Sequence, residues 1–305
     1  MATRKSIRPI WLDSGSGLIV PSGTVSDIVS TSSNTYLQIK QKAVALEQLY
    51  TESTVLLPPT CDLARWIADA KTLSDLWLMN KTSDLSMALV FRGMHLDRIA
   101  EAVLSLQHIP NREEYLTALT SGSLDLFDRQ QSKAKDILWE LEMWSIFRRR
   151  AMEAALAEPP DIVVSFEGVK VGVACKKLYS EKHVQNVLSQ GVAQIEASFD
   201  FGIIALNLDD LIPPNQLLRK PTQRSMGECI VDLNTRFLKS HERHFRKYLS
   251  SGRLLSALVS TSLIADVYKE QPQFVNACQA SIWTIPGLPS EKYRQLQKFY
   301  AQLME

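Results

Sequence analysis

The sequence predicts an α/β fold in which a mixed β-sheet is flanked by helices and preceded by an α-helical N-terminal region. From Tyr36 to about Leu119, apolar residues recur at steps of three and four, which is the spacing of one helical face. After about residue 130, apolar stretches of strand length alternate with amphipathic segments, which is typical of helices packed on a sheet. We therefore divide the chain into a mostly helical region, residues 1–128, and an α/β domain, residues 129–305.

The composition is that of an ordinary globular protein with one large domain or two smaller ones. The chain has 305 residues, of which 45% are hydrophobic, and its net charge is +1. The overall charge therefore does not indicate a nucleic-acid binder, although a net charge of +1 is compatible with a local basic groove. The four cysteines lie far apart, which favours a reducing compartment over disulfide bonds or a zinc site. The first residues lack the apolar stretch of a secretory signal, and no run of about 18 apolar residues occurs, so we expect a cytoplasmic protein without a membrane span.

The expected elements follow one another along the chain. Residues 1–35 are rich in Ser, Thr and Gly, which indicates loop or short strand, and prolines then separate the helical segments up to residue 119. The α/β domain is predicted to run helix, two strands, helix, strand, helix, two strands, helix. These segments are 130–156, the hairpin 161–176, 180–198, 201–208, 229–252, 254–266, 280–287 and 290–303.

The segment from Asp161 to Lys176 predicts a β-hairpin with a two-residue turn at Glu167-Gly168. Paired residues then have numbers that add up to 335. One face carries only apolar side chains and is predicted to pack on the core: Ile162, Val164, Phe166, Val169, Val171, Val173 and Cys175. On the opposite face Asp161 lies across from Ala174, with Cβ atoms roughly 5 Å apart, and diagonal to Lys176. An Asp and a Lys therefore meet on one patch.

This pattern resembles the PD-(D/E)XK nuclease superfamily, which has the restriction-endonuclease-like fold. Pro160-Asp161 matches the "PD" half of the motif, and Ala174-Cys175-Lys176 occupies the "(D/E)XK" half with alanine in place of the acid. The order of helix, hairpin, crossover helix and strand is similar to the family's αβββαβ core over about residues 130–210. The resemblance implies a restriction-endonuclease-like mixed sheet flanked by helices in residues 129–305, and hydrolysis of phosphodiester bonds with Mg²⁺ or Mn²⁺.

Phosphodiester hydrolysis requires hard oxygen ligands and a cation beside the phosphate. Mg²⁺ prefers carboxylates and water, and it lowers the pKa of a bound water. We therefore expect Asp161 to be a metal ligand and Lys176 to be the catalytic cation that offsets developing negative charge. The family resemblance adds the backbone carbonyl of Cys175 as a metal ligand. A single aspartate holds Mg²⁺ weakly, so a second carboxylate is needed.

The preceding helix is the expected source of that carboxylate, because Ala174 cannot supply it. Glu140 lies on the edge of the apolar stripe of this helix, and we favour it over Glu142. Some branches of the superfamily are similar in using a helix glutamate about twenty residues before the aspartate. On the following helix, Gln194 stands where related nucleases place a polar residue near the site, and Glu196 is a weaker candidate.

The sequence thus predicts a metal-dependent nuclease that acts on DNA rather than RNA, and a role in microbial restriction or anti-phage defence would suit it. The basic segment 229–252 would supply local charge for DNA. The helical region is expected to recognise a partner, which could be a protein, a substrate or a regulatory signal, and a homodimer is left open. The alternative, favoured by Ala174, is a catalytically inactive nuclease-like domain that serves as a nucleic-acid or protein-binding subunit. A third class, an interaction scaffold, would leave the Asp161–Lys176 patch without a role.

Overall fold

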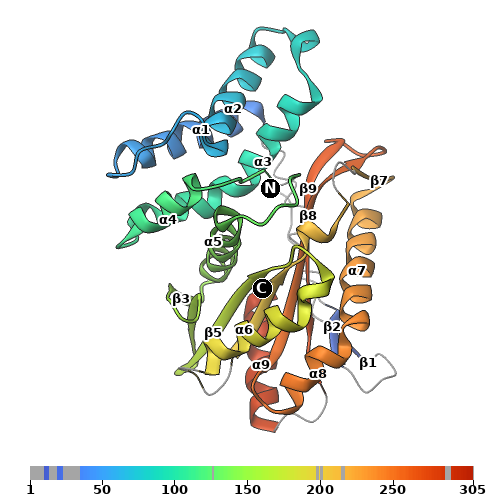
Figure 1. The fold of residues 1–305 in the computed structure, drawn as a ribbon. Helices are drawn as coiled ribbons and strands as arrows, with labels where there is room; N and C mark the ends of the chain where they lie inside the picture. Colours follow the sequence, from blue (N-terminus) through green and yellow to red (C-terminus); the bar gives the residue numbers. More distant parts are fainter. Residues whose placement is uncertain are drawn as a thin grey trace.

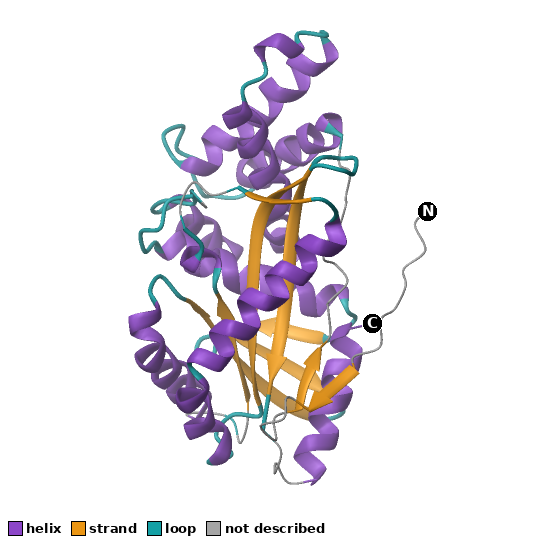
Figure 2. Ribbon diagram, turned by 90° about the vertical axis from the view of Figure 1, so that its right-hand side faces the viewer, coloured by secondary structure: helices purple, strands orange, loops and turns teal. Residues whose placement is uncertain are grey.

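The structure, a computed structural model, describes residues 10–13, 19–22, 35–125, 127–196, 199, 202–213, 217–285 and 290–304. A helical region sits at one end of a curved mixed sheet, and helices cover both faces of that sheet (Figures 1 and 2). The predicted class, a mixed α/β sheet flanked by helices after a helical N-terminal region, is confirmed. Among the described residues, no helix is both long and apolar enough to cross a membrane.

The helical character predicted between residues 36 and 119 is confirmed. Several of these helices begin at a residue whose side chain accepts a hydrogen bond from the first turn, as Thr35 does from the N–H of Gln38 and Ser86 from that of Leu89. The helices are α1 (Tyr36–Thr51), α2 (Asp62–Leu78), α3 (Met87–Leu104) and α4 (Arg112–Thr120). The proposed boundary at residue 128 falls in the loop after α4 and stays a prediction.

The long helix predicted over residues 130–156 is wrong at its C-terminal end. Helix α5 (Lys133–Arg149) stops there, and Ala151 has a φ of 53°, which lies outside the helical region. Residues Glu153–Leu156 form strand β3, which pairs antiparallel with β4. The sequence Glu-Ala-Ala-Leu has high helix propensity, so its pairing in the sheet overrides a local preference. Three strands therefore follow α5, where the sequence predicts two.

The main sheet is built around the long strand β8. Strands β3, β4 and β5 form an antiparallel meander, and β5, β6 and β8 run parallel to one another. Strands β6 and β7 pair with successive lengths of one edge of β8, while β9 pairs antiparallel with the other edge. The strands are β4 (Ile162–Phe166), β5 (Val169–Lys177), β6 (Gly202–Asn207), β7 (Leu218–Lys220), β8 (Ser256–Val267) and β9 (Phe274–Trp283).

Several boundaries outside the hairpin differ from the expected ones. The segment 229–252 is not one helix but two, α7 (Gln223–Ser240) and α8 (Glu242–Ser250), which meet at His241. Strand β7 is not predicted from the sequence, and β9 begins six residues earlier than the predicted strand at 280. The remaining elements are α6 (Val184–Glu196), α9 (Ser290–Met304) and a separate hairpin of β1 (Ile10–Asp13) and β2 (Ile19–Ser22); the rest of residues 1–34 lies outside the described residues.

The predicted register of the Asp161–Lys176 hairpin is confirmed. Ile162 pairs with Val173 and Phe166 with Val169, so paired numbers add up to 335. The turn residues Glu167 and Gly168 have φ values of 47° and 79°. Two consecutive positive φ values are what a two-residue hairpin turn needs to follow the twist of its strands.

The sheet has a hydrophobic core on each face. The first core joins α1–α5 and α9 to one face of the sheet, and it contains Ile162, Val173 and Cys175. The second core joins α6, α7 and α8 to the other face, and it contains Ala174 and Ile204. Alternate residues of β5 therefore enter opposite cores, and the Asp161 side of the hairpin lies beneath α6.

Candidate active site at the open end of the hairpin

Asp161 lies directly before β4 and is almost fully buried. Its Oδ2 accepts hydrogen bonds from the backbone N–H of Cys175, at 2.6 Å, and from Nζ of Lys176, at 3.1 Å. Its Oδ1 accepts one from Nε2 of Gln194, at 3.4 Å. The structure thus brings together three side chains that the sequence proposes for the site: Asp161 directly before β4, Lys176 on β5 and Gln194 on α6.

The register of β5 places the backbone carbonyl of Cys175 on the same edge as its N–H. The N–H of Leu178 bonds to β6, so even-numbered residues of β5 face β6 and Cys175 faces the β4 edge. The N–H and C=O of one strand residue point to the same edge. By the register, the residue across from Cys175 is Pro160, which has no N–H to donate to that carbonyl. The Cys175 carbonyl therefore points to the strand edge on which Asp161 lies.

Glu140 on α5 completes the acidic side of this cluster. Burial, and then the negative charge of Asp161, raise the pKa of Glu140 to about 8, while the Lys176 ammonium acts in the opposite direction. Glu158 and Asp136 add smaller effects that also raise it. Glu142 lies in a different environment, where both of its oxygens are bound by Arg98, at 2.9 and 3.1 Å. Of the two helix acids, Glu140 is therefore the one whose carboxyl interacts with Asp161 and Lys176.

The raised pKa of Glu140 predicts how stability depends on pH. Between about pH 4.5 and pH 8 the folded state holds a proton on Glu140 that the unfolded chain releases, so the free energy of unfolding falls as pH rises through this window. Glu140→Gln removes this dependence of the free energy of unfolding on pH. As pH rises through the window, the variant should gain stability relative to the wild type by at most ~1.4 kcal/mol per pH unit. Denaturant unfolding of both proteins at several pH values measures the difference; parallel curves would contradict the assignment.

Ala174, in the place of the motif acid, is fully buried under α6. A Cβ added at Gly191 would lie 3.4 Å from the Ala174 Cβ and 2.6 Å from Cδ1 of Ile204. A side chain at residue 191 would therefore require the Ile204 side chain to shift, and glycine lets α6 pack closely on the sheet here. Gln194 follows Gly191 by one helical turn, so the same close approach brings its amide to Asp161. The Gln194 Oε1 is buried without a hydrogen-bond partner among the described residues, and it is an acceptor available to a bound water.

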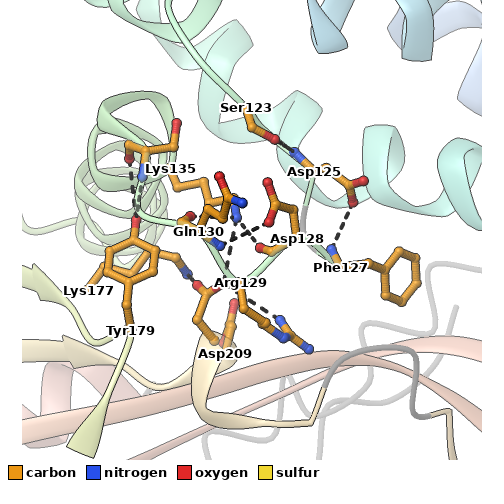
Figure 3. A network of polar contacts seen from close by, with 12 residues as sticks. Ser123, Asp125, Phe127, Asp128, Arg129, Gln130, Lys135, Lys177, Tyr179 and Asp209 are labelled. Atoms are coloured by element: carbon orange, nitrogen blue, oxygen red, sulfur yellow. Dashed lines mark hydrogen bonds and ion pairs between the residues drawn. The ribbon is translucent and has the colours of Figure 1, made fainter. Parts of the chain in front are cut away.

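A second group of charged residues, not predicted from the sequence, surrounds Lys177, the residue after Lys176 (Figure 3). Nζ of Lys177 binds Asp210, at 2.6 Å, and Asn207, at 2.6 Å, at the end of β6. Lys135 lies 3.6 Å from Asp210 and also donates to the backbone carbonyl of Asp128. The acids that directly follow the buried strand β6 are the sequence signal for this network.

The same network continues through Arg98, which binds Asp209 at 2.8 Å as well as Glu142. Its members largely neutralise one another, and they tie α3 and the loop before α5 to the sheet. We assign them to the architecture around the site. In the described part of the chain, no three His, Cys, Asp or Glu side chains gather into a metal site, so a metal at Asp161 would also need backbone oxygen and water as ligands.

Comparison of the chain with protein-family models, with curated proteins and with solved structures finds no match. The residues at the open end of the hairpin, and their geometry, are therefore the basis for the function proposed below.

Proposed function

We propose that this chain is a metal-dependent nuclease with a restriction-endonuclease-like core, that it acts on DNA, and that its cofactor is Mg²⁺ or Mn²⁺. The observation that carries the proposal is the convergence of Asp161, Lys176 and Gln194 where β4 and β5 separate. Glu140 supports it, because the charges of Asp161 and Lys176 both act on its carboxyl. The order α5-β3-β4-β5-α6-β6 supports it, because it is the αβββαβ order of that superfamily, including the strand that the sequence pattern misses.

Each residue of the cluster has a role suited to phosphodiester hydrolysis. Asp161, Glu140 and the Cys175 carbonyl would hold the metal, and Lys176 and Gln194 would face the substrate. The ion supplies a bound water of lowered pKa and polarises the phosphate. Without a metal, Lys176 forms an ion pair with Asp161. When Asp161 binds a metal ion, the Lys176 ammonium would be free to offset negative charge on the phosphate. Gln194 would orient the water through its Oε1.

The two helix acids provide a matched pair of variants. Glu140→Ala should weaken Mn²⁺ binding by several-fold to about a hundredfold, because a two-carboxylate site loses one ligand. Glu142→Ala should leave Mn²⁺ binding nearly unchanged, because Glu142 is paired with Arg98. Isothermal titration of both variants decides the choice, and equal losses or the reverse order would remove Glu140 from the site.

Exposed basic side chains on α7 and α8 support DNA as the substrate. Arg236, Lys239, Arg243 and Lys247 are exposed, and both helices pack on the sheet face that α6 covers. Helix α8 lies against α6, which carries Gln194. Cations in this position would hold the phosphate backbone of a duplex next to Asp161.

Removal of two of these cations should weaken DNA binding in a way that depends on salt. For Arg243→Ala/Lys247→Ala, we expect the slope of log affinity against log salt concentration to decrease in magnitude by about two, with weaker binding to all sequences. The matched control is Arg65→Ala/Lys81→Ala, which removes two exposed cations from the helical region. Fluorescence anisotropy of a labelled duplex measures both variants, and equal behaviour of the two would contradict a DNA surface on α7 and α8.

A catalytically inactive nuclease-like domain is the second candidate, and Ala174 is the observation that favours it. Such a domain would bind nucleic acid or protein without cleaving. A protein partner for the helical region is supported by exposed apolar side chains at the end of α2 and the start of α3, namely Trp77, Leu78, Met79 and Met87. A role in restriction or anti-phage defence, a homodimer and a cytoplasmic location stay predictions.

A further inference from the structure

A cavity of about 270 Å³, partly open to solvent, lies between the helical region and the sheet; its lining includes residues of the first core and the exposed side chains of Glu101 and Arg149. Helices α3 and α5 form one side, and strands β8 and β9 form the other. Glu142 lines it, whereas Glu140 on the same helix belongs to the candidate active site. The cavity is thus separate from that site, although α5 contributes to both.

The cavity exists because the strand residues that face it are small. Ser262 pairs with Cys278 and Ser260 with Ala280 on neighbouring strands, and all four line the space. Protein interiors are packed so closely that voids much larger than a water molecule are few. Large side chains at these positions would fill the space, so a hollow of this size fits the dimensions of a small ligand.

The charged residues at the cavity are already matched in pairs. Its lining includes Arg98, which binds Glu142 at 2.9 Å; Lys42, which binds Asp97 at 2.7 Å; and Arg149, which binds Glu101 at 3.1 Å. Three cations and three anions leave no net charge among these side chains. A ligand that carries charge would lose its hydration without gaining a counter-charge.

The uncharged groups define the chemistry of the ligand. Trp139, Met143 and Leu258 provide an apolar wall, and the hydroxyls of the lining serines can donate or accept hydrogen bonds. Asn276 also lines the cavity, and its Oδ1 is buried without a hydrogen-bond partner among the described residues. We propose that this cavity binds a small uncharged molecule with a flat apolar body and an O–H or N–H donor. The proposal does not depend on nuclease activity.

The test uses 2-naphthol as the probe and 2-naphthoate as its charged counterpart. Isothermal titration of the full chain should give one saturable site for 2-naphthol, with a Kd of roughly 10 μM to 1 mM, the range expected for a ligand of this size. The anion should bind at least tenfold more weakly. Absence of saturable binding of 2-naphthol, or equal binding of the anion, would overturn the proposal.

Variants that fill the cavity locate the binding. Ser260→Leu and Ala280→Leu each place an apolar side chain into the space and should weaken 2-naphthol binding at least tenfold. Gln185→Leu adds the same side chain at an exposed position on α6, outside the cavity, and should bind like the wild type. Circular dichroism shows whether each variant folds. If Ser260→Leu or Ala280→Leu does not fold, the binding measured with the other variant tests the location of the site. Unchanged binding in a folded, filled variant would place the ligand elsewhere and contradict the assignment.

Discussion

Replacement of Asp161 by alanine is expected to abolish the binding of Mg²⁺ and Mn²⁺, and with it any cleavage of DNA. Asp161 is the carboxylate on which Cys175, Lys176 and Gln194 converge, so its loss removes the centre of the cluster. Isothermal titration with Mn²⁺ should show no saturable binding, because loss of a direct ligand should exceed the roughly hundredfold effect of removing a supporting group.

Two further variants separate metal binding from folding. Asp161→Asn keeps an oxygen that can accept from the Cys175 N–H while it removes the charge, and it should also lose metal binding. Glu196→Ala is the matched control, because this α6 carboxylate is paired with Arg253 at 2.7 Å, and it should bind Mn²⁺ like the wild type. If the folded Asp161→Asn variant bound Mn²⁺ as tightly as the wild type, the metal site would have to lie elsewhere.

Replacement of Lys176 by alanine should have the opposite pattern, with metal binding kept and turnover lost. The ammonium carries the same sign of charge as the ion and competes with it for Asp161 Oδ2, at 3.1 Å, so its removal should leave Mn²⁺ affinity unchanged or slightly tighter. Turnover on plasmid DNA should fall by at least about a hundredfold, the scale for loss of one electrostatic group that stabilises a transition state.

The control for this variant is Lys170→Ala, which removes an exposed lysine from the same face of the same strand. It should retain both metal binding and turnover. Cleavage that survives Lys176→Ala unchanged would mean that another group stabilises the phosphate, and that the cluster has been given the wrong role.

The hairpin could be predicted from the sequence because its signals are local. Strict alternation of apolar residues sets the face, and Glu167-Gly168 sets the turn, so the register follows from the positions of neighbouring residues alone. The meeting of Asp161 with Lys176 is a direct consequence of that register. The contact of Gln194 with Asp161 depends on one more residue, because Gly191 lets α6 pack closely on the sheet.

Features that depend on distant parts of the chain could not be predicted from local sequence signals. Strand β3 has the composition of a helix, and only β4 beside it makes it a strand. Arg98 binds Asp209 across 111 residues of sequence, and no periodicity marks such a pair. The cavity beside it arises from small residues on β8 and β9 that face α5, a relation that appears only when all three elements are placed together.

The most direct test of the proposed function is a cleavage assay of the wild type with supercoiled plasmid and linear DNA, in the presence of Mg²⁺ or Mn²⁺. An Asp161→Ala preparation made in parallel controls for contaminating nucleases. The proposal predicts nicking or linearisation by the wild type with at least one of the two metals, complete loss on chelation, and no cleavage by the variant. A folded wild type that leaves DNA intact with both metals, or equal cleavage by both preparations, would contradict it and favour the binding-subunit alternative.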